Sequence, residues 1–452
     1  MILRSVRVRP LFMTQQVLTY RTVSLQRAFI ALISDMPPKK RKSSSISAMN
    51  GASSDTNKRG KPDLTRPHPH AKDTEDFGIV LRDFYPPEMC NERCEAYNNG
   101  TLERPIESLQ RAYEDTFDER QKIEPKTAVV HWFKTDLRLH DNRGLQMAYQ
   151  VAREHNLPLI GLYILSPEDL TAHLSSAPRV DLTLRTLELL RRDLNELDIP
   201  LYMETQEARK DIPQRIINLC QEWGASHLFA NLEYEVDELR REAKLVRLCA
   251  RNDIRFEAAH DTCVVTPGKL VSQQGKQYAV YSPWFRSWCA FLNENPEYLE
   301  VADEPGSNPG DARKDFKTLF DCEVPVAPEN KRLTEEEKTR FRELYPEGEH
   351  EALRRLEAFL EEKANDYDDL RNSLAGRNTS VLSPYFASGA LSARTAVFEA
   401  RKKNKGQLNA NQTGYASWIS EVAWRDFYKH VLVHWPFIWC VFSIFANYLY
   451  PH

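Results

Sequence analysis

The sequence has few glycines, few cysteines and no long apolar run in its main body. Sixteen glycines in 452 residues fall well below the usual share of about 7%. No Gly-X-Gly-X-X-Gly motif follows the first predicted strand, which disfavours a dinucleotide-dependent dehydrogenase. Without a run of eighteen apolar residues, a polytopic membrane protein is excluded. Eight cysteines without a Cys-X-X-Cys pair argue against a disulfide scaffold and a structural zinc site, so we expect no metal.

Positive charge is concentrated at the amino-terminal end. Residues 1–72 contain fourteen Lys or Arg residues against three acidic ones, although the whole chain has a formal net charge of −4. The other residues therefore carry an excess of negative charge, and any nucleic-acid contact would need a local basic surface. Arg401, Lys402, Lys403 and Lys405 form such a run. A solvated helix end, where basic residues are favoured, is an equally good interpretation.

Two address-like patterns occupy the first 72 residues. Residues 1–34 contain five Arg residues but no Asp, Glu or Lys, which is typical of a mitochondrial presequence; an ordinary basic tail is the alternative. Residues 36–42, Met-Pro-Pro-Lys-Lys-Arg-Lys, form a compact cluster of the nuclear-localisation type. We predict a disordered targeting tail over 1–72, with nuclear and mitochondrial forms that start at Met36 or Met1.

Strand and helix patterns alternate between residues 126 and 260. Helices are expected between successive strands, and this alternation predicts an α/β fold with a Rossmann-like doubly wound parallel sheet. An extension precedes this unit over 73–125, a linker with Pro, Gly and charge clusters follows over 261–345, and helical periodicity returns at 348–365. The strands themselves are predicted from short apolar runs at 128–133, 159–165, 201–203, 227–230 and 255–259.

A later helix has two chemically different faces. At 100° per residue, the polar and aromatic residues share a face about 120° wide, and aliphatic residues cover a separate one. A pure core helix would not bury Glu and Arg without partners, so we predict that the first face lines a ligand cavity. A surface Glu–Arg pair beside packed aromatics is the alternative. The first face consists of Trp418, Glu421, Trp424, Arg425 and Tyr428.

The segment Thr379-Ser380-Val381-Leu382-Ser383 places three hydroxyl side chains before Pro384. Proline in this position favours the start of a helix. Backbone N–H groups and hydroxyls at a helix start make an anion site, whereas a plain serine N-cap is the alternative.

The stretch 132–142, Trp-Phe-Lys-Thr-Asp-Leu-Arg-Leu-His-Asp-Asn, resembles the opening strand and loop of the DNA photolyase/cryptochrome family. Residues 231–238 and 281–285 agree with that family. The resemblance covers about residues 126–436 and is greatest to fungal-like class I cyclobutane pyrimidine dimer photolyases. It implies an antenna domain over 126–260, followed by the amino-terminal part of an all-α FAD-binding domain over 346–436.

The resemblance also assigns roles to individual residues. Glu421 and Trp424 would contact the lesion and carry the catalytic role, and Arg371 and Tyr428 would join them in contacting DNA. FAD would contact Tyr367, Thr379, Ser380, Val381, Leu382, Ser383, Trp418 and Arg425.

The family's antenna site corresponds to Asp237 and Glu238. In relatives that use folate, this pair lines the pocket, so methenyltetrahydrofolate is the expected antenna. Asp237 departs from the Asn that is usual in the bacterial pattern. Two solvated acids in the first turn of a helix are the alternative.

The family pattern stops after Pro436. Residues 437–452 form an atypical apolar tail, too short for a membrane span, so we expect no membrane association. Relatives continue with further flavin contacts, so we expect an incomplete FAD-binding domain and weak FAD retention. Three functions stay open: light-driven repair of pyrimidine dimers in damaged DNA, a cryptochrome-like blue-light photoreceptor, and a non-catalytic truncated product. Relatives are mostly monomers, and we expect the same here.

Overall fold

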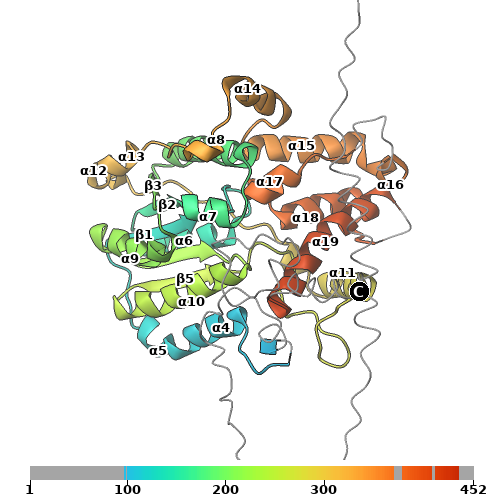
Figure 1. Cartoon of the computed structure of the whole chain (residues 1–452), viewed down its shortest axis with the longest axis horizontal. Coiled ribbons are helices and arrows are strands. Elements are labelled where there is room, and N and C mark those ends of the chain that lie inside the picture. The colour runs from blue at the N-terminus through green and yellow to red at the C-terminus, as the bar shows by residue number, and fades with distance from the viewer. Residues whose placement is uncertain (1–95, 98, 371–378, 410–412, 437–452) are drawn as a thin grey trace, which may run out of the picture.

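The computed structural model describes residues 96–97, 99–370, 379–409 and 413–436. A parallel sheet with its helices forms one half of the molecule, and a group of helices forms the other (Figure 1). The predicted tails at 1–72 and 437–452, and also Arg371, lie outside the described residues.

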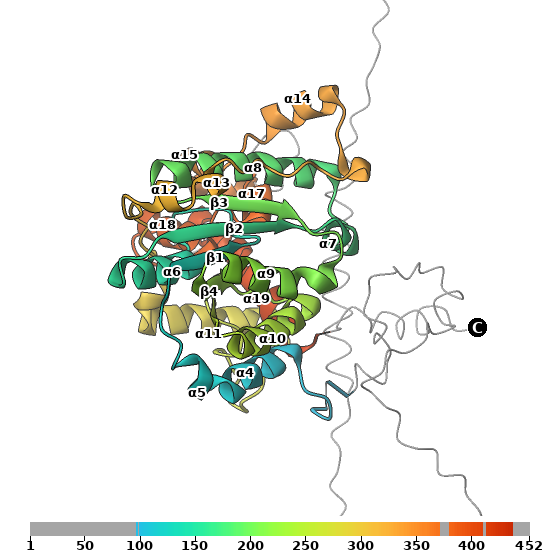
Figure 2. The same ribbon diagram turned by 90° about the vertical axis from the view of Figure 1, so that its left-hand side faces the viewer.

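Five strands form one parallel sheet in the order β3-β2-β1-β4-β5. All residues of β1, β2 and β4 are buried, as expected for strands that have helices on both faces. The strands run side by side in Figure 2. This topology confirms the predicted doubly wound α/β fold. The strands are β1 (Ala128–Phe133), β2 (Leu159–Leu165), β3 (Leu201–Thr205), β4 (Ala225–Asn231) and β5 (Arg255–Ala259).

Helices cover both faces of the sheet. On one face, α6 and α8 pack in a core with Val129 and Phe133, and on the other α9 and α10 pack in a core with Val130 and Trp132. Helix α6 is capped at its start, because the Asn142 side chain accepts a hydrogen bond from the Leu145 N–H at 3.0 Å. The helices are α6 (Arg143–Glu154), α7 (Pro167–Ala172), α8 (Ala177–Glu196), α9 (Ile212–Glu222) and α10 (Val236–Arg251).

The described part of the amino-terminal extension packs on this α/β half. It contains α4 (Pro105–Asp115) and α5 (Phe117–Arg120), and Leu109 of α4 is buried in the same core as α10. Arg104 also donates a hydrogen bond to the backbone carbonyl of His434 at 2.8 Å. The extension therefore touches a helix that lies far along the chain.

The segment predicted as a linker, 261–345, contains helices. The longest is α11 (Tyr281–Glu294), whose Trp284 and Trp288 are buried in the core of the helical half. Pro283 lies in the first turn of α11, where proline needs no hydrogen-bond partner, so it does not interrupt this helix. The other helices are α12 (Ala312–Asp315), α13 (Lys317–Phe320) and α14 (Glu335–Leu344).

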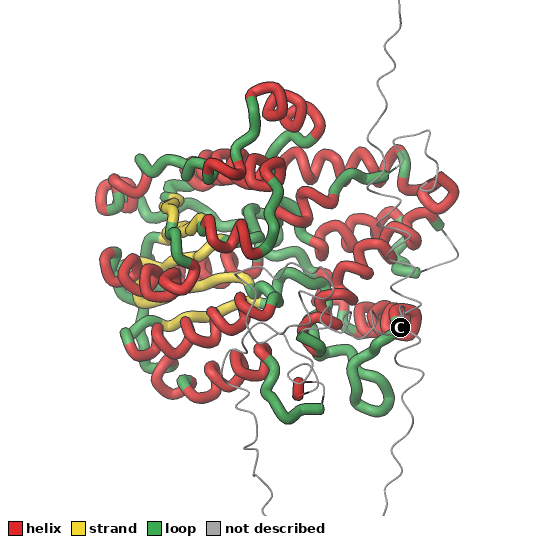
Figure 3. Tube along the Cα trace, in the orientation of Figure 1, coloured by secondary structure: helices red, strands yellow, loops and turns green. Residues whose placement is uncertain are grey.

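The helical half is separate from the strands in Figure 3. The long helix α19 contributes Trp418 and Ile419 to the helical core, whereas Val433 near its end lies in the α/β core. This helix therefore joins the two halves. Among the described residues, no helix has the length and apolar character that a membrane span requires. The helices are α15 (Glu349–Glu362), α16 (Tyr367–Leu370), α17 (Ser383–Ser388), α18 (Ala393–Lys403) and α19 (Gly414–His434).

A buried ionic cluster holds the halves in register. Arg394 of α18 donates to the carboxylates of Asp141 and Asp261, both at 2.8 Å. Arg138 donates to the carbonyl of Gly389 at 3.0 Å. Gly389 has φ 75°, and a Cβ atom there would lie 1.9 Å from the carbonyl oxygen of Thr135. Only glycine fits this close contact without strain.

Candidate functional site

A cavity of about 720 Å³ lies between the two halves. It opens at the carboxyl ends of β1, β2 and β4, where parallel sheets of this kind bind ligands. Helices α17 and α19 close it from the other side. Lining residues from the α/β half include Lys134, Ser166, His173 and Glu238, and those from the helical half include Tyr367, Ser380, Ser383, Trp418, Glu421 and Arg425.

One face of α19 supplies much of the helical wall. Trp418, Glu421 and Arg425 of the predicted face line the cavity, and so does Val422, which belongs to the face predicted to be aliphatic. Trp418 is 3% exposed and packs against Phe359, with ring centroids 5.2 Å apart. The guanidinium of Arg425 donates to the carbonyl of Thr262 at the end of the α/β half. A positive charge is therefore held in place at the cavity wall.

The hydroxyl-rich loop before α17 forms another wall. Ser380 and Ser383 line the cavity. Val381 has φ 54°, in the left-handed region, and Leu382 follows with φ −94° and ψ −7°. Consecutive left- and right-handed residues turn their N–H groups toward one side, which makes a nest for anions. A β-branched residue in the left-handed region is strained, by about 1–3 kcal/mol, and such strain collects at functional sites.

The other residues predicted to contact flavin differ in whether they reach the cavity. Tyr367 lines the cavity and packs edge-on against Phe359, with ring centroids 5.6 Å apart. Leu382 is buried in the helical core, so its backbone rather than its side chain is available to a ligand. Thr379 is exposed and does not line the cavity.

Trp424 and Tyr428 do not line the cavity, although they share the predicted face with Glu421. Trp424 is partly buried and stacks on Tyr281, with ring centroids 3.5 Å apart and planes inclined by 10°. Tyr428 is 47% exposed and also packs against Trp424, with ring centroids 5.5 Å apart. Sequence reasoning placed Tyr281 only in a family stretch and gave it no role.

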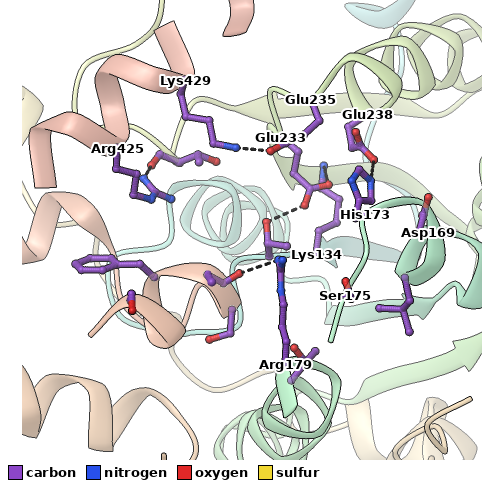
Figure 4. A pocket seen from close by; sticks show the side chains of 18 of the residues that line it. Lys134, Asp169, His173, Ser175, Arg179, Glu233, Glu235, Glu238, Arg425 and Lys429 are labelled. Carbon is purple, nitrogen blue, oxygen red and sulfur yellow. Dashed lines mark hydrogen bonds and ion pairs between the residues drawn. The ribbon is translucent and has the colours of Figure 1, made fainter. Parts of the chain in front are cut away.

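The α/β end of the cavity is built around Glu238. Its Oε1 atom bonds to Nε2 of His173 at 2.9 Å, and its Oε2 atom is buried without a hydrogen-bond partner among the described residues. Burial acts to raise the pKa of Glu238, but His173 and Arg241 outweigh it and lower this pKa to about 2. In return, the hydrogen bond to Glu238 raises the pKa of His173. Figure 4 shows the two side chains directed toward each other.

Asp237, the other member of the predicted antenna pair, does not line the cavity. Its carboxylate lies 3.2 Å from the guanidinium of Arg209. Burial raises the pKa of Asp237. The structure therefore brings only Glu238 of this pair to the cavity.

Three potential metal ligands lie close together at this end: the ligand atoms of Asp169, His173 and Glu238 are within 4.8 Å of one another. Arg209 pairs with Asp169 at 2.7 Å, and Arg241 pairs with it at 3.6 Å. These guanidinium groups already supply the positive charge that a cation would bring. We therefore assign no metal to the cluster.

A second network, made of buried ion pairs, was not predicted from the sequence. Lys134 pairs with Glu242, which is fully buried, and Arg241 lies 3.3 Å from Glu233. Both cations lie over the ring of Trp132, at 4.9 and 5.0 Å from its centroid. Charged residues on a helix such as α10 usually face solvent, so the sequence carried no signal for this arrangement.

An ion pair links the two ends of the site. Lys429 of α19 pairs with Glu235, which directly precedes α10 and its residue Glu238. Figure 4 shows Lys429 extending across the cavity edge toward Glu235. Burial acts to raise the pKa of Glu235, but Lys429 outweighs it and lowers this pKa.

Comparisons with known proteins agree with this architecture. The family model described as DNA photolyase matches residues 129–302. The deoxyribodipyrimidine photo-lyase of Neurospora crassa is 56% identical over 380 residues, which are 83% of this chain and 62% of that protein. The mitochondrial deoxyribodipyrimidine photo-lyase of Saccharomyces cerevisiae is 28% identical over 394 residues, covering 81% of this chain and 67% of the relative. The chain thus spans about three fifths of the length of the Neurospora protein.

Solved structures show the same fold. A class III photolyase from Agrobacterium tumefaciens superposes with a TM-score of 0.55 at 23% identity, covering 69% of this chain and 60% of that one. A cryptochrome from Synechocystis superposes with a TM-score of 0.51 at 18% identity, covering 68% and 62%.

Proposed function

Because the chain belongs to the DNA photolyase/cryptochrome family, in its fungal-like class I branch, we propose that it acts in light-driven repair of cyclobutane pyrimidine dimers in DNA. The observation that carries this proposal is that Trp418, Glu421 and Arg425 line the same cavity as Ser380 and Ser383, which bear hydroxyl groups. The cavity volume of about 720 Å³ is within the range of cofactor sites.

The residues present fit the phosphate side of FAD. The nest at Val381 and Leu382 offers backbone N–H groups, and the hydroxyls of Ser380 and Ser383 can donate to phosphate oxygens. Trp418 offers an apolar wall for the ring system, and Arg425 adds positive charge. When bound in its reduced form, FAD supplies the electron that opens the cyclobutane ring.

The protein's own contribution is to hold the lesion. A dimer inside a duplex is out of reach, so it must be turned out of the stack, at a cost of a few kcal/mol that is least for a damaged site. Glu421 lines the cavity and is exposed toward solvent, so its carboxylate can accept a hydrogen bond from a pyrimidine N3–H. Trp424 lies on the same helix face and offers a flat surface for stacking.

A folate antenna, methenyltetrahydrofolate, is proposed for the α/β end of the cavity. The support is the buried Oε2 atom of Glu238, which lacks a hydrogen-bond partner among the described residues. A carboxylate in this position can accept N–H groups from a pterin ring. Asp237, held by Arg209, would act only indirectly.

Contact with damaged DNA is proposed through Tyr428, which is 47% exposed, and through Arg371, which follows the cavity-lining Tyr367 by four positions in the sequence. The basic run at the end of α18 is a weaker candidate. Lys402 pairs with Glu399 at 2.9 Å and Lys403 with Glu361 at 3.2 Å, so part of its charge is already balanced. We further propose a monomer that acts in the nucleus and in mitochondria.

The decisive experiment is photoreactivation of dimer-containing DNA by this chain, with added FAD and a dark control. Light-dependent repair that falls in both Glu421→Ala and Trp424→Ala supports the proposal. Stoichiometric flavin absorbance without repair would favour a cryptochrome-like photoreceptor instead. Failure to retain any flavin would favour a non-catalytic product and refute the proposal.

A further inference from the structure

Tyr281 and Trp424 form the closest ring pair among the described residues, so that Tyr281 covers one face of Trp424. The centroids are 3.5 Å apart and the planes differ by 10°. The pair belongs to a longer column, because Phe285 stacks behind Tyr281 at 5.4 Å and Trp288 behind Phe285 at 5.8 Å. Tyr281 is thus clamped between Trp424 and the body of α11.

The hydroxyl of Tyr281 is fixed as well as its ring. It donates to the backbone carbonyl of Ser420 at 2.8 Å. The Oγ atom of Ser420 also lies within hydrogen-bonding distance of the Tyr281 hydroxyl, at 2.8 Å. Burial raises the pKa of Tyr281, so this hydroxyl stays protonated and able to donate. Ser420 is four residues before Trp424, one helical turn away on the same side of α19. Tyr281 therefore holds the backbone below Trp424 and the ring of Trp424 at once.

The helix that carries Tyr281 is itself tied to α19. The indole N–H of Trp288 donates to Asp426, and that of Trp284 to His430, both at 3.4 Å. All four of these side chains are buried. Because α11 is anchored along its length, Tyr281 is a rigid support rather than a loose neighbour.

The other tyrosine beside Trp424 is different. Tyr428 is 47% exposed, and its ring lies 5.5 Å from that of Trp424 with planes inclined by 29°. Glu421, on the same helix face, reaches the cavity. Trp424 is therefore covered by a fixed ring from α11 and also borders a tyrosine that is open to solvent.

We propose that Tyr281 is a positioning residue, which holds the indole plane of Trp424 so that the face not covered by Tyr281 can stack on a pyrimidine turned out of DNA. The inference rests on the proposed function, because it assumes that Trp424 meets the lesion. An indole that can tilt would lose stacking area without losing its place in the fold. Tyr281 therefore affects lesion preference rather than general DNA affinity.

The test compares Tyr281→Phe with Tyr415→Phe in the full chain. Tyr415 lies on α19, the helix that carries Trp424, and its hydroxyl donates to the carbonyl of Leu360 at 3.0 Å. Both variants therefore lose one hydrogen bond from a tyrosine to the backbone. The first readout is dark binding of a short duplex with one thymine dimer and of the same duplex undamaged. The affinity ratio is the affinity for the dimer-containing duplex divided by that for the undamaged duplex. We expect Tyr281→Phe to lower this ratio by roughly three- to tenfold, the size of one net hydrogen bond, and Tyr415→Phe to leave it unchanged.

The second readout follows Trp424 directly. In protein labelled with 5-fluorotryptophan, the Trp424 resonance is assigned by its loss in Trp424→Phe, and we expect it to shift or broaden in Tyr281→Phe but not in Tyr415→Phe. An unchanged resonance overturns the proposal, and so does an unchanged affinity ratio while Trp424→Ala abolishes dimer preference. No dimer preference in the unmodified chain would refute the proposed function and the positioning role together.

Discussion

Glu349, the first residue of α15, is expected to make the stability of the protein depend on pH. Its carboxylate accepts hydrogen bonds from the backbone N–H groups of Leu139 and His140, at 2.8 and 2.7 Å. Burial nevertheless raises the pKa of Glu349 from 4.5 to about 7. The native state therefore binds a proton more tightly than the unfolded chain, and stability falls as pH rises through the interval between these values.

The magnitude follows from the two pKa values. A difference between 4.5 and about 7 corresponds to about 3 kcal/mol at pH 8. Gln resembles the protonated carboxyl group, so Glu349→Gln should match the parent near pH 4.5 and be more stable at pH 8, by up to about 3 kcal/mol. Urea unfolding at both pH values measures this difference.

A control on the same helix predicts the opposite sign. The hydrogen bond from Arg354 lowers the pKa of Glu351, so Glu351→Gln should lose stability at pH 8 and lose less near pH 4. The reasoning would be refuted if Glu349→Gln were less stable than the parent at pH 8, since that result means the buried carboxylate is the favoured form.

Two further predictions concern the contact between the halves. In Gly389→Ala, the new Cβ would lie 1.9 Å from the carbonyl oxygen of Thr135, so we expect at least about 2 kcal/mol of destabilisation in urea; a change below 0.5 kcal/mol would contradict the close contact. Arg394→Met would leave the buried carboxylates of Asp141 and Asp261 without their shared partner, and we expect a loss of about 3–5 kcal/mol. A double variant that also carries Asp141→Asn should recover part of that loss in a double-mutant cycle, and strict additivity would argue against the pairing.

The sequence predicted the sheet well because its signal is local. The apolar runs at 159–165 and 255–259 coincide with β2 and β5, and Asn142, a residue type that favours helix starts, caps α6. The face of α19 was also predictable, since the positions of Trp418 and Arg425 follow from helical periodicity alone.

The parts of the site that the sequence did not predict depend on contacts between distant segments. The stack of Tyr281 on Trp424 and the bond between His173 and Glu238 join residues that no periodicity relates. Trp424 was expected beside Glu421 in the cavity, but a neighbouring helix supplies a better partner for its ring. Helical periodicity gives the direction of a side chain, whereas the identity of its neighbour is set by tertiary packing.

The path of α19 has a consequence for how the molecule forms. Its buried residues belong to both cores, from Trp418 to Val433, and the bond from Arg104 to the His434 carbonyl spans 330 positions. Contacts of such sequence separation form late, because a long loop must close first. During synthesis, the sheet can assemble long before α19 emerges. The cavity thus gains the wall that α19 supplies only when the two cores become one cooperative unit, so ligand binding should report on the docking of α19.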